Sequence, residues 1–155
     1  MARPRGWEIV ERAKAGERLV FDGGYGTALF AAGLSNGACP ELWNDTHPEV
    51  VRGIHKGYFD AGSDFVETNT FGANRFKLAV HGLASRVREI NLRGAKLARD
   101  VRETMGRDVF VLGSIGPLGK YLAPLGAITQ EDARAAFHEQ AEGLLEGGVD
   151  AFVIE

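Results

Sequence analysis

The sequence predicts an α/β protein in which parallel strands alternate with helices. The main evidence is a repeat: Gly-x-Asp followed by a short apolar run begins at Gly62, Gly106 and Gly148, and a looser copy begins at Gly16. The four glycines lie 46, 44 and 42 residues apart, and each can end a helix in the left-handed conformation. Between them, apolar residues recur at spacings of three and four, which is typical of helices.

A helix is expected before each apolar run. A short helix over residues 7–15 precedes the first run, and Thr46 and Glu49 form a capping box for the second helix. Ser85 and Thr129 are expected to cap the next two, Thr129 together with Asp132. The expected apolar faces are Val51, Ile54, Tyr58 and Ala61, then Val87, Ile90, Gly94, Leu97 and Val101, then Ala133, Phe137, Ala141 and Leu144.

The apolar runs themselves predict four strands. They cover residues 19–21, 65–66, 109–112 and 151–154 and are rich in Val, Ile and Phe. Because no polar residue interrupts them, we expect strands that are buried on both faces, as in a parallel sheet covered by helices. Right-handed crossovers would connect them.

Two architectures fit this order, an open doubly wound sheet and a (β/α)8 barrel. The connections after the strands are long, at about residues 23–45, 71–84 and 113–128, whereas the helix-to-strand connections are short. Long loops at the carboxyl side of every strand are typical of the active-site face of a barrel. A barrel needs about 250 residues, so residues 1–155 are expected to form one N-terminal, truncated half, with about four βα units ending at strand four.

Composition excludes several classes of protein. The 155 residues carry a net charge of −3, with 45% hydrophobic and 25% charged residues, which is ordinary for soluble globular proteins. No apolar run approaches the roughly 20 residues that span a bilayer, and a mildly acidic chain is a poor nucleic-acid binder. The first residues do not resemble a signal peptide, and a single cysteine, Cys39, is typical of a reducing compartment. We therefore expect a cytoplasmic protein with neither membrane nor nucleic acid as partner.

Small and polar residues follow the predicted strands, where ligands are held in such folds. The Asp22-Gly23-Gly24 turn can point backbone N–H groups at an anion or can simply be a tight turn. A dinucleotide-binding loop is excluded because Leu29 occupies the position of its third glycine. The Thr68-Asn69-Thr70 cluster could line a site or cap a strand end, and Glu155 could bind an ammonium group or be solvated.

The histidines and the cysteine do not form a metal-binding pattern. His47 lies at the start of an expected helix and His55 and His138 lie on expected helices, so structural or solvated roles are expected for these three. His81 follows a helix and marks a loop. Cys39 has no histidine or cysteine at the spacing of a metal site.

Taken together, the motifs resemble the homocysteine S-methyltransferase family over nearly the whole chain, in the family's order. The most specific match begins at Thr68. The matching stretches are Asp22-Gly23-Gly24-Tyr25-Gly26-Thr27, Pro40-Glu41-Leu42-Trp43-Asn44, His47-Pro48-Glu49-Val50-Val51, Ala61-Gly62-Ser63-Asp64, Thr68-Asn69-Thr70-Phe71-Gly72-Ala73-Asn74, Gly113-Ser114-Ile115-Gly116-Pro117 and Phe152-Val153-Ile154-Glu155.

The resemblance implies a (β/α)8 barrel that transfers a methyl group from a donor to the thiol of homocysteine, giving methionine. A free thiol has a pKa of about 8.5, and the family binds it to zinc as the thiolate. The family's zinc cysteines belong to the second half of the barrel, beyond Glu155, so neither a metal ligand nor a catalytic residue is expected within this chain.

By the same resemblance, Asp22, Gly23 and Glu155 would hold the amino-acid end of homocysteine, and Asn69 and Thr70 would line the same mouth. The complete protein could carry further C-terminal domains, and the isolated chain is expected to be inactive and to self-associate. Two alternatives remain open at this stage: a non-catalytic half-barrel that binds a partner or itself, and an unrelated phosphate-binding barrel.

Overall fold

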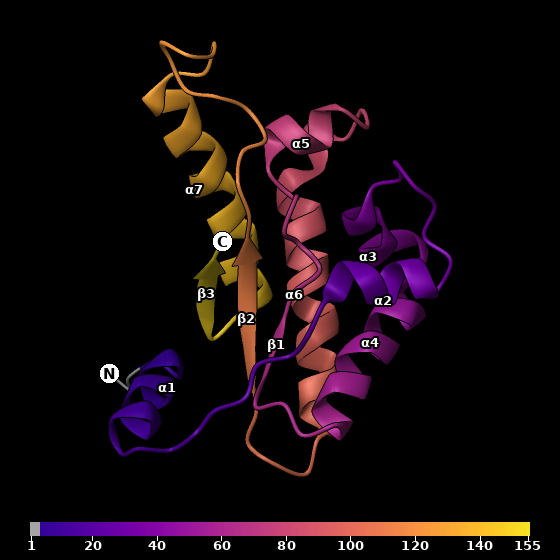
Figure 1. Cartoon of the computed structure of the whole chain (residues 1–155), viewed down its shortest axis with the longest axis vertical. Coiled ribbons are helices and arrows are strands. Elements are labelled where there is room, and N and C mark those ends of the chain that lie inside the picture. Colours follow the sequence, from indigo (N-terminus) through magenta and orange to yellow (C-terminus); the bar gives the residue numbers. More distant parts are fainter. Residues whose placement is uncertain (1–3) are drawn as a thin grey trace.

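A parallel sheet of three strands forms the centre of the computed structural model, which describes residues 4–155 (Figure 1). The strands are β1 (Phe65–Glu67), β2 (Phe110–Ile115) and β3 (Ala151–Ile154), in the spatial order β1-β2-β3. Their register places Phe65 beside Phe110 and Ser114 beside Val153. The α/β class and the parallel order of the strands are therefore confirmed.

Helices connect the strands and cover one side of the sheet. The two long helices, α6 (Val87–Thr104) and α7 (Gln130–Gly147), pack on each other and on β2, and α4 (Pro48–Asp60) packs on α6. Shorter helices precede or follow them. They are α1 (Gly6–Lys14), α2 (Tyr25–Ala31), α3 (Trp43–Thr46) and α5 (Arg75–Ala79), with 3-10 turns at Pro40–Leu42 and Ala84–Arg86.

The two faces of the sheet bury different side chains. Val66 and Val111 point toward the helices and pack with Phe59 of α4 and Ala98 of α6. On the opposite face, the Phe65 and Phe110 rings stack with their centroids 5.6 Å apart. Paired residues of parallel strands share a face and alternate residues return to it, so this second face continues upward through Leu112 and Ala151 to Glu67, Ser114 and Glu155. This face of the sheet is thus apolar toward the amino ends of the strands and polar at their carboxyl ends.

The first predicted strand is wrong. Residues 19–21 have no strand conformation, although Val20 accepts hydrogen bonds from the N–H groups of Asp64 (2.7 Å) and Phe65 (3.3 Å). The pairing stops there because the side chain of Asp22 takes the next N–H of β1, that of Glu67, at 2.8 Å. The sheet of the described residues therefore has three strands and not the four expected.

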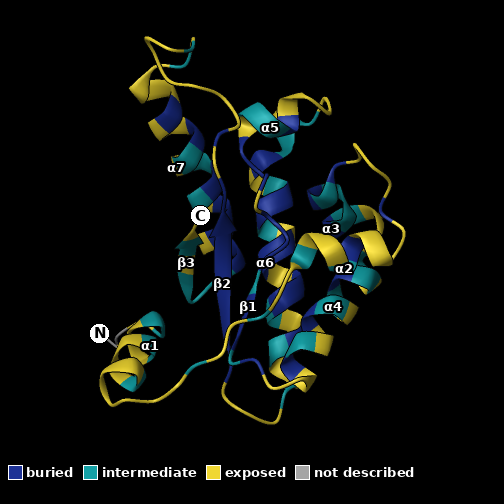
Figure 2. Ribbon diagram, in the orientation of Figure 1, coloured by how far each residue is buried: buried dark blue, intermediate teal, exposed yellow. Residues whose placement is uncertain are grey.

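The last strand also differs from the prediction, because it is not buried on both faces. Figure 2 shows β2 buried along its length while β3 alternates. Phe152 is 38% exposed and Ile154 is 79% exposed. As the edge strand of this sheet, β3 lacks a neighbour on one side within the described residues.

Helix caps were predicted with mixed success. Thr129 and Asp132 form the expected reciprocal capping box at α7. The Thr46 box does not form, because the residue that caps α4 is His47. Thr46 is instead the last residue of α3, and its hydroxyl donates to the carbonyl of Leu42. Ser85 caps nothing either, since it lies inside the 3-10 turn that leads into α6.

The repeat has a structural explanation. Gly16, Gly62 and Gly148 adopt the left-handed backbone expected of them, whereas Gly106 does not. Two of the aspartates tie a strand to the segment beside it: Asp64, before β1, accepts the N–H of Val20, and Asp150, before β3, accepts the N–H of Val111 in β2, both at 2.8 Å. Asp108, at the third copy, instead pairs with Arg5 beneath the sheet.

Among residues 4–155, no helix has the length and apolar composition needed to cross a membrane.

Candidate functional site

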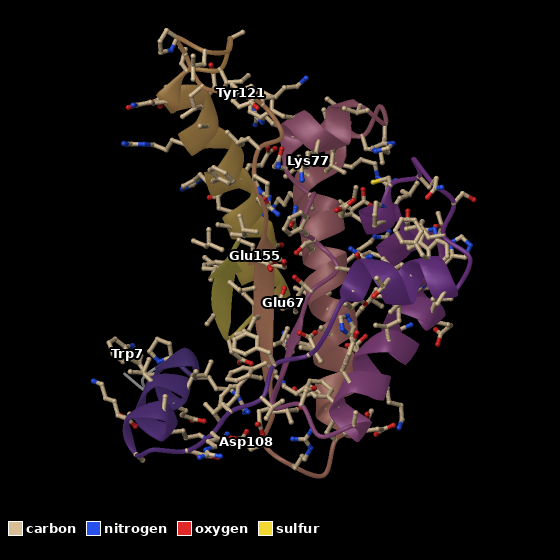
Figure 3. The ribbon with its side chains drawn as sticks, viewed as in Figure 1. Trp7, Glu67, Lys77, Asp108, Tyr121 and Glu155 are labelled. Carbon is tan, nitrogen blue, oxygen red and sulfur yellow. The ribbon has the colours of Figure 1, made fainter. Side chains whose placement is uncertain are left out.

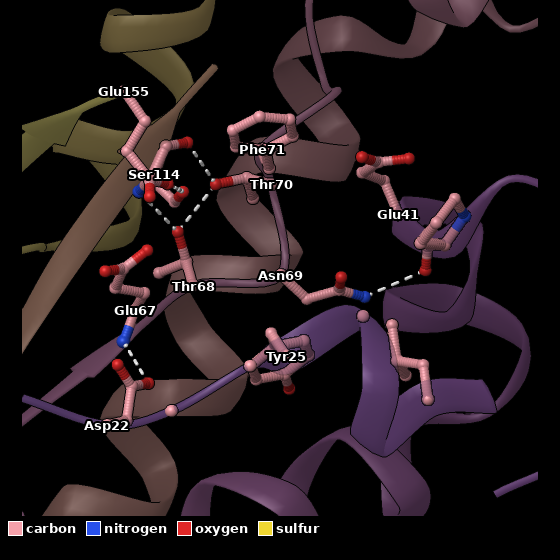
Figure 4. Close-up of a pocket in the computed structure, with 15 residues that line it drawn as sticks. Asp22, Tyr25, Glu41, Glu67, Thr68, Asn69, Thr70, Phe71, Ser114 and Glu155 are labelled. Carbon is pink, nitrogen blue, oxygen red and sulfur yellow. Dashed lines mark hydrogen bonds between the residues drawn. The ribbon is translucent and has the colours of Figure 1, made fainter. Parts of the chain in front are cut away.

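A cavity of about 520 Å³ opens at the carboxyl ends of the strands. All five residues predicted from the sequence, Asp22, Gly23, Asn69, Thr70 and Glu155, line it. The structure therefore brings together groups that are up to 133 positions apart in the chain. The other lining residues are Gly24, Tyr25, Gly26, Leu29, Pro40, Glu41, Glu67, Thr68, Phe71 and Ser114 (Figure 4).

Three carboxyl groups, those of Asp22, Glu67 and Glu155, dominate one wall. Figure 3 shows Glu67 and Glu155 side by side near the middle of the molecule, far from Asp108 at the other end of the strands. Asp22 accepts the backbone N–H of Glu67 at 2.8 Å, and Ser114 Oγ donates to Glu155 Oε2 at 3.3 Å. Glu67 was not predicted as a site residue; its signal was its position directly after an apolar run.

Two of these carboxyl groups hold protons more tightly than usual. Burial raises the pKa of Asp22 to about 6, against the opposing effect of the N–H bond from Glu67. Burial, followed by repulsion from Glu155 and Asp22, raises the pKa of Glu67 to about 7. A wall of this kind is stabilised by a proton or by a bound cation.

The glycine turn lies beside this wall. A Cβ on Gly23 would stand 3.1 Å from the Tyr58 ring, and one on Gly24 would stand 2.8 Å from Thr27 Oγ1. The carbonyl of Gly24 accepts hydrogen bonds from Thr27 (2.8 Å) and from the Tyr58 hydroxyl (3.1 Å). Within residues 4–155, the N–H groups of Gly23 and Gly24 donate to no protein acceptor. The turn is thus fixed through its carbonyl, which leaves its donors for a ligand.

A chain of hydroxyl groups fixes the loop after β1 (Figure 4). Thr70 Oγ1 donates to the carbonyl of Ser114 at 2.8 Å, so Thr68 Oγ1 donates to Thr70 Oγ1 at 2.6 Å. Thr68 Oγ1 in turn accepts the N–H of Ser114 at 3.1 Å. The hydroxyls of both threonines are therefore used to hold the loop on β2, as expected for strand-end capping, while both residues also line the cavity.

Asn69 is held from the other side. Its amide nitrogen donates to the carbonyl of Pro40 (2.8 Å) and to Asn44 Oδ1 (3.1 Å). Three buried amides from the helices then satisfy the loop's carbonyls. Asn44 donates to Asn69, Gln140 to Thr70 and Asn91 to Ala73, at 2.8, 2.8 and 2.9 Å.

Sequence analysis missed these supporting amides. Asn91 and Gln140 sit next to predicted apolar helix faces, and both are fully buried. A buried amide is costly unless it is hydrogen-bonded, so an amide within an apolar stripe was the available signal.

Cys39 does not fit a zinc site. Its thiol donates to Glu41 Oε2 at 3.3 Å, and burial together with the Glu41 charge raises the pKa of Cys39 to about 11, which disfavours the thiolate that zinc binds. Glu41 is engaged as well, because its Oε1 accepts the N–H of Gly72 at 2.6 Å. No group of three or more candidate metal ligands occurs in the part of the chain that the structure describes.

The histidines are not part of the cavity wall. His55 is completely buried, and burial lowers its pKa to about 3. Its Nε2 lies 3.4 Å from the hydroxyl of Tyr25. His47 contacts Thr46, and His138 lies exposed beside Glu142. These placements agree with the structural or solvated roles expected for these three residues.

Together, the parallel sheet and the cavity define an α/β protein with a polar small-molecule site at the carboxyl ends of its strands. A sequence model of homocysteine S-methyltransferases matches residues 19–155. The chain therefore belongs to the homocysteine S-methyltransferase family, and the resemblance inferred from its motifs is confirmed.

The similar proteins are much longer than this chain. Methionine synthase of Mycobacterium tuberculosis is 42% identical over 146 residues, which are 88% of this chain and 12% of that protein. Methionine synthase of Mycobacterium leprae is 40% identical over 146 residues, again 88% of this chain and 12% of that protein.

Solved structures show the same relationship. The homocysteine methyltransferase MmuM of Escherichia coli, in its metallated form, superposes with a TM-score of 0.75 at 26% identity, covering 93% of this chain and 56% of MmuM. Its oxidised form superposes with a TM-score of 0.72 at 26% identity, covering 86% of this chain and 51% of MmuM. These neighbours belong to a TIM-barrel family, and the chain spans about half of their length.

Proposed function

We propose that residues 1–155 form the N-terminal, amino-acid-binding half of the (β/α)8 barrel of a homocysteine S-methyltransferase. In the complete protein a methyl group passes from a donor to the thiol of homocysteine, giving methionine. The observation that carries the proposal is the meeting of the glycine turn with Asp22, Glu67 and Glu155 in one cavity. Family membership supplies the identity of the amino acid.

The two ends of a zwitterionic amino acid match the two parts of this wall. Asp22 and Glu155 bind the ammonium group, which forms charge-assisted hydrogen bonds with carboxylates. The free N–H groups of Gly23 and Gly24 bind the substrate carboxylate. Asn69 and Thr70 shape the mouth, and the buried amides behind them keep that shape before the substrate arrives.

Zinc belongs to this proposal only in the complete protein. The described residues do not fit a zinc site, since Cys39 is a hydrogen-bond donor with a raised pKa. We therefore propose that zinc ligands, contacts to the methyl donor and any further domains are supplied by segments outside residues 1–155. Alone, these residues would bind the amino-acid end without methylating the thiol. A cytoplasmic location is part of the same proposal.

One observation favours a second candidate, a non-catalytic half-barrel that associates with a partner or with itself. Apolar side chains are exposed along both edges of the sheet. They are Val20 and Phe21 beside β1, and Phe152 and Ile154 in β3. Open apolar edges promote association. A protein with this role would self-associate without binding homocysteine.

The test uses the complete protein and the substitution Glu155→Gln, which keeps the shape of the side chain and removes its charge. A charge-assisted hydrogen bond contributes about 1.5–3 kcal/mol. Because Glu155 is exposed, we expect the lower end of that range, or roughly tenfold weaker homocysteine binding. Zinc content should remain at the parent level. The exposed Glu131→Gln serves as the matched control and should bind as the parent does.

Two results would contradict the assignment. Unchanged homocysteine affinity in Glu155→Gln would mean that Glu155 only ends a strand. Loss of zinc from the same variant would mean that its carboxylate supports the metal and not the ammonium group.

A further inference from the structure

The cavity holds more negative charge than one ammonium group needs. Four carboxyl side chains line it, those of Asp22, Glu41, Glu67 and Glu155, and its lining residues within the described chain include no Lys, Arg or His. The neighbouring Lys77 does not compensate, because its Nζ lies over the Phe71 ring at 4.6 Å and lines a separate cavity. In the free protein, the carboxyl groups must therefore be balanced in another way.

Glu67 is the carboxyl group at the centre of this imbalance. It lies at the end of β1 on the same face of the sheet as Ser114 and Glu155. Asp22 faces it from the segment before α2, Glu155 from the end of β3, and the Tyr25 and Tyr58 rings belong to α2 and α4. No cation among these elements pairs with Glu67, whose side chain lies beside that of Glu155 (Figure 3) and whose backbone N–H donates to Asp22.

Resting on the proposed function, we propose that Glu67 is a further substrate-binding residue that carries a proton in the free protein. The protonated carboxyl donates to Glu155, so the two groups share one negative charge. When the ammonium group of the amino acid enters, Glu67 releases this proton to solvent and all the neighbouring carboxylates face the cation. The substrate keeps its own ammonium protons, so one proton appears in solution for each molecule bound.

The direction of the pKa agrees with this arrangement. The raised pKa of Glu67, about 7, means that the free site is largely protonated at pH 6.5. A ligand that binds the ionised site more tightly must lower that pKa and expel protons. Affinity therefore rises with pH through this range and levels off above it.

The test uses methionine as the probe, in the complete protein. Homocysteine is unsuitable because its thiol can release a proton of its own, whereas the thioether of methionine has none. Calorimetric titration in two buffers with different ionisation enthalpies measures the protons released. At pH 6.5 we expect roughly half to one proton per methionine for the parent protein, and an affinity that tightens by about tenfold between pH 5.5 and pH 8.

Glu67→Gln should lose most of the proton release and most of the pH dependence, whereas the exposed Glu131→Gln should retain both. Proton release that persists in Glu67→Gln would transfer the role to Asp22 and overturn the inference. Methionine binding to the parent protein without proton release would overturn it as well, whatever the variant does. If neither methionine nor homocysteine binds the parent protein, the proposed function itself is wrong.

Discussion

Replacing Gly94 by alanine tests how the helix layer supports the candidate site. Gly94 lies on the buried face of α6, directly behind the loop after β1. A Cβ there would stand 2.7 Å from Thr70 Cγ2 and 2.8 Å from Asn44 Nδ2. Both neighbours are buried and hydrogen-bonded to the loop or to β2, so neither can move without breaking a contact.

The expected magnitude follows from two opposing effects. Overpacking a well-packed interior costs about 1–3 kcal/mol, while replacing glycine by alanine within a helix stabilises it by about 1 kcal/mol. Gly53 in α4 is the matched control, because its Cβ would meet no atom within 4 Å. Gly53→Ala should therefore raise the free energy of unfolding by about 1 kcal/mol. Gly94→Ala should lie about 1–3 kcal/mol below Gly53→Ala.

Urea denaturation of the parent protein and the two variants measures this difference directly. Gly94→Ala should also weaken homocysteine binding, since Asn44 positions Asn69, whereas Gly53→Ala should not. Equal stabilisation by the two substitutions would refute the packing of α6 against the loop that supports the site.

Four further results are expected. Residues 1–155 expressed alone should sediment as oligomers because of the exposed sheet edges, and a monomer that melts in one cooperative step would contradict this. Cys39→Ser should leave the zinc content of the complete protein unchanged, as measured by metal analysis. Burial lowers the pKa of His55 to about 3. The stability that neutral His55 permits should therefore be full above its unfolded pKa of about 6.5 and should fall as pH decreases toward 3. The melting temperature of His55→Leu should fall less steeply with decreasing pH than that of the parent protein. The pKa of Glu67 is raised to about 7, so the contribution of the protonated Glu67 to stability is lost as pH rises from its unfolded pKa of about 4.3 to 7. Glu67→Gln should therefore melt at a higher temperature than the parent protein at pH 8 but not at pH 4.

Local sequence signals predicted the four longest helices, α1, α4, α6 and α7, and three of the strands. They missed the short helices α2, α3 and α5, which lie in segments expected to be loops. Gly148 and the Thr129–Asp132 box mark helix ends through contacts within a few residues, which a sequence reveals directly. The strand predicted at residues 19–21 does not form because Asp22 ends the pairing: its side chain reaches across to β1 and accepts the N–H of Glu67. That contact joins residues 45 positions apart.

The same distinction applies to the site. Strand-end positions predicted Asp22, Asn69 and Glu155, since parallel strands present their carboxyl ends at one edge. The raised pKa of Glu67 could not be read from its neighbours in sequence, because it arises first from burial in the fold and then from Glu155 and Asp22 on other elements. The supporting amides of Asn44 and Gln140 were likewise hidden, since their partners lie 25 and 70 residues away.

The most direct test of the central claim is a crystal structure of the complete protein with bound homocysteine. The account predicts that the amino nitrogen lies within hydrogen-bonding distance of the carboxylates of Asp22 and Glu155, with the substrate carboxylate at the N–H groups of Gly23 and Gly24. An amino-acid end located outside this cavity, or a substrate carboxylate turned toward Glu155, would contradict it.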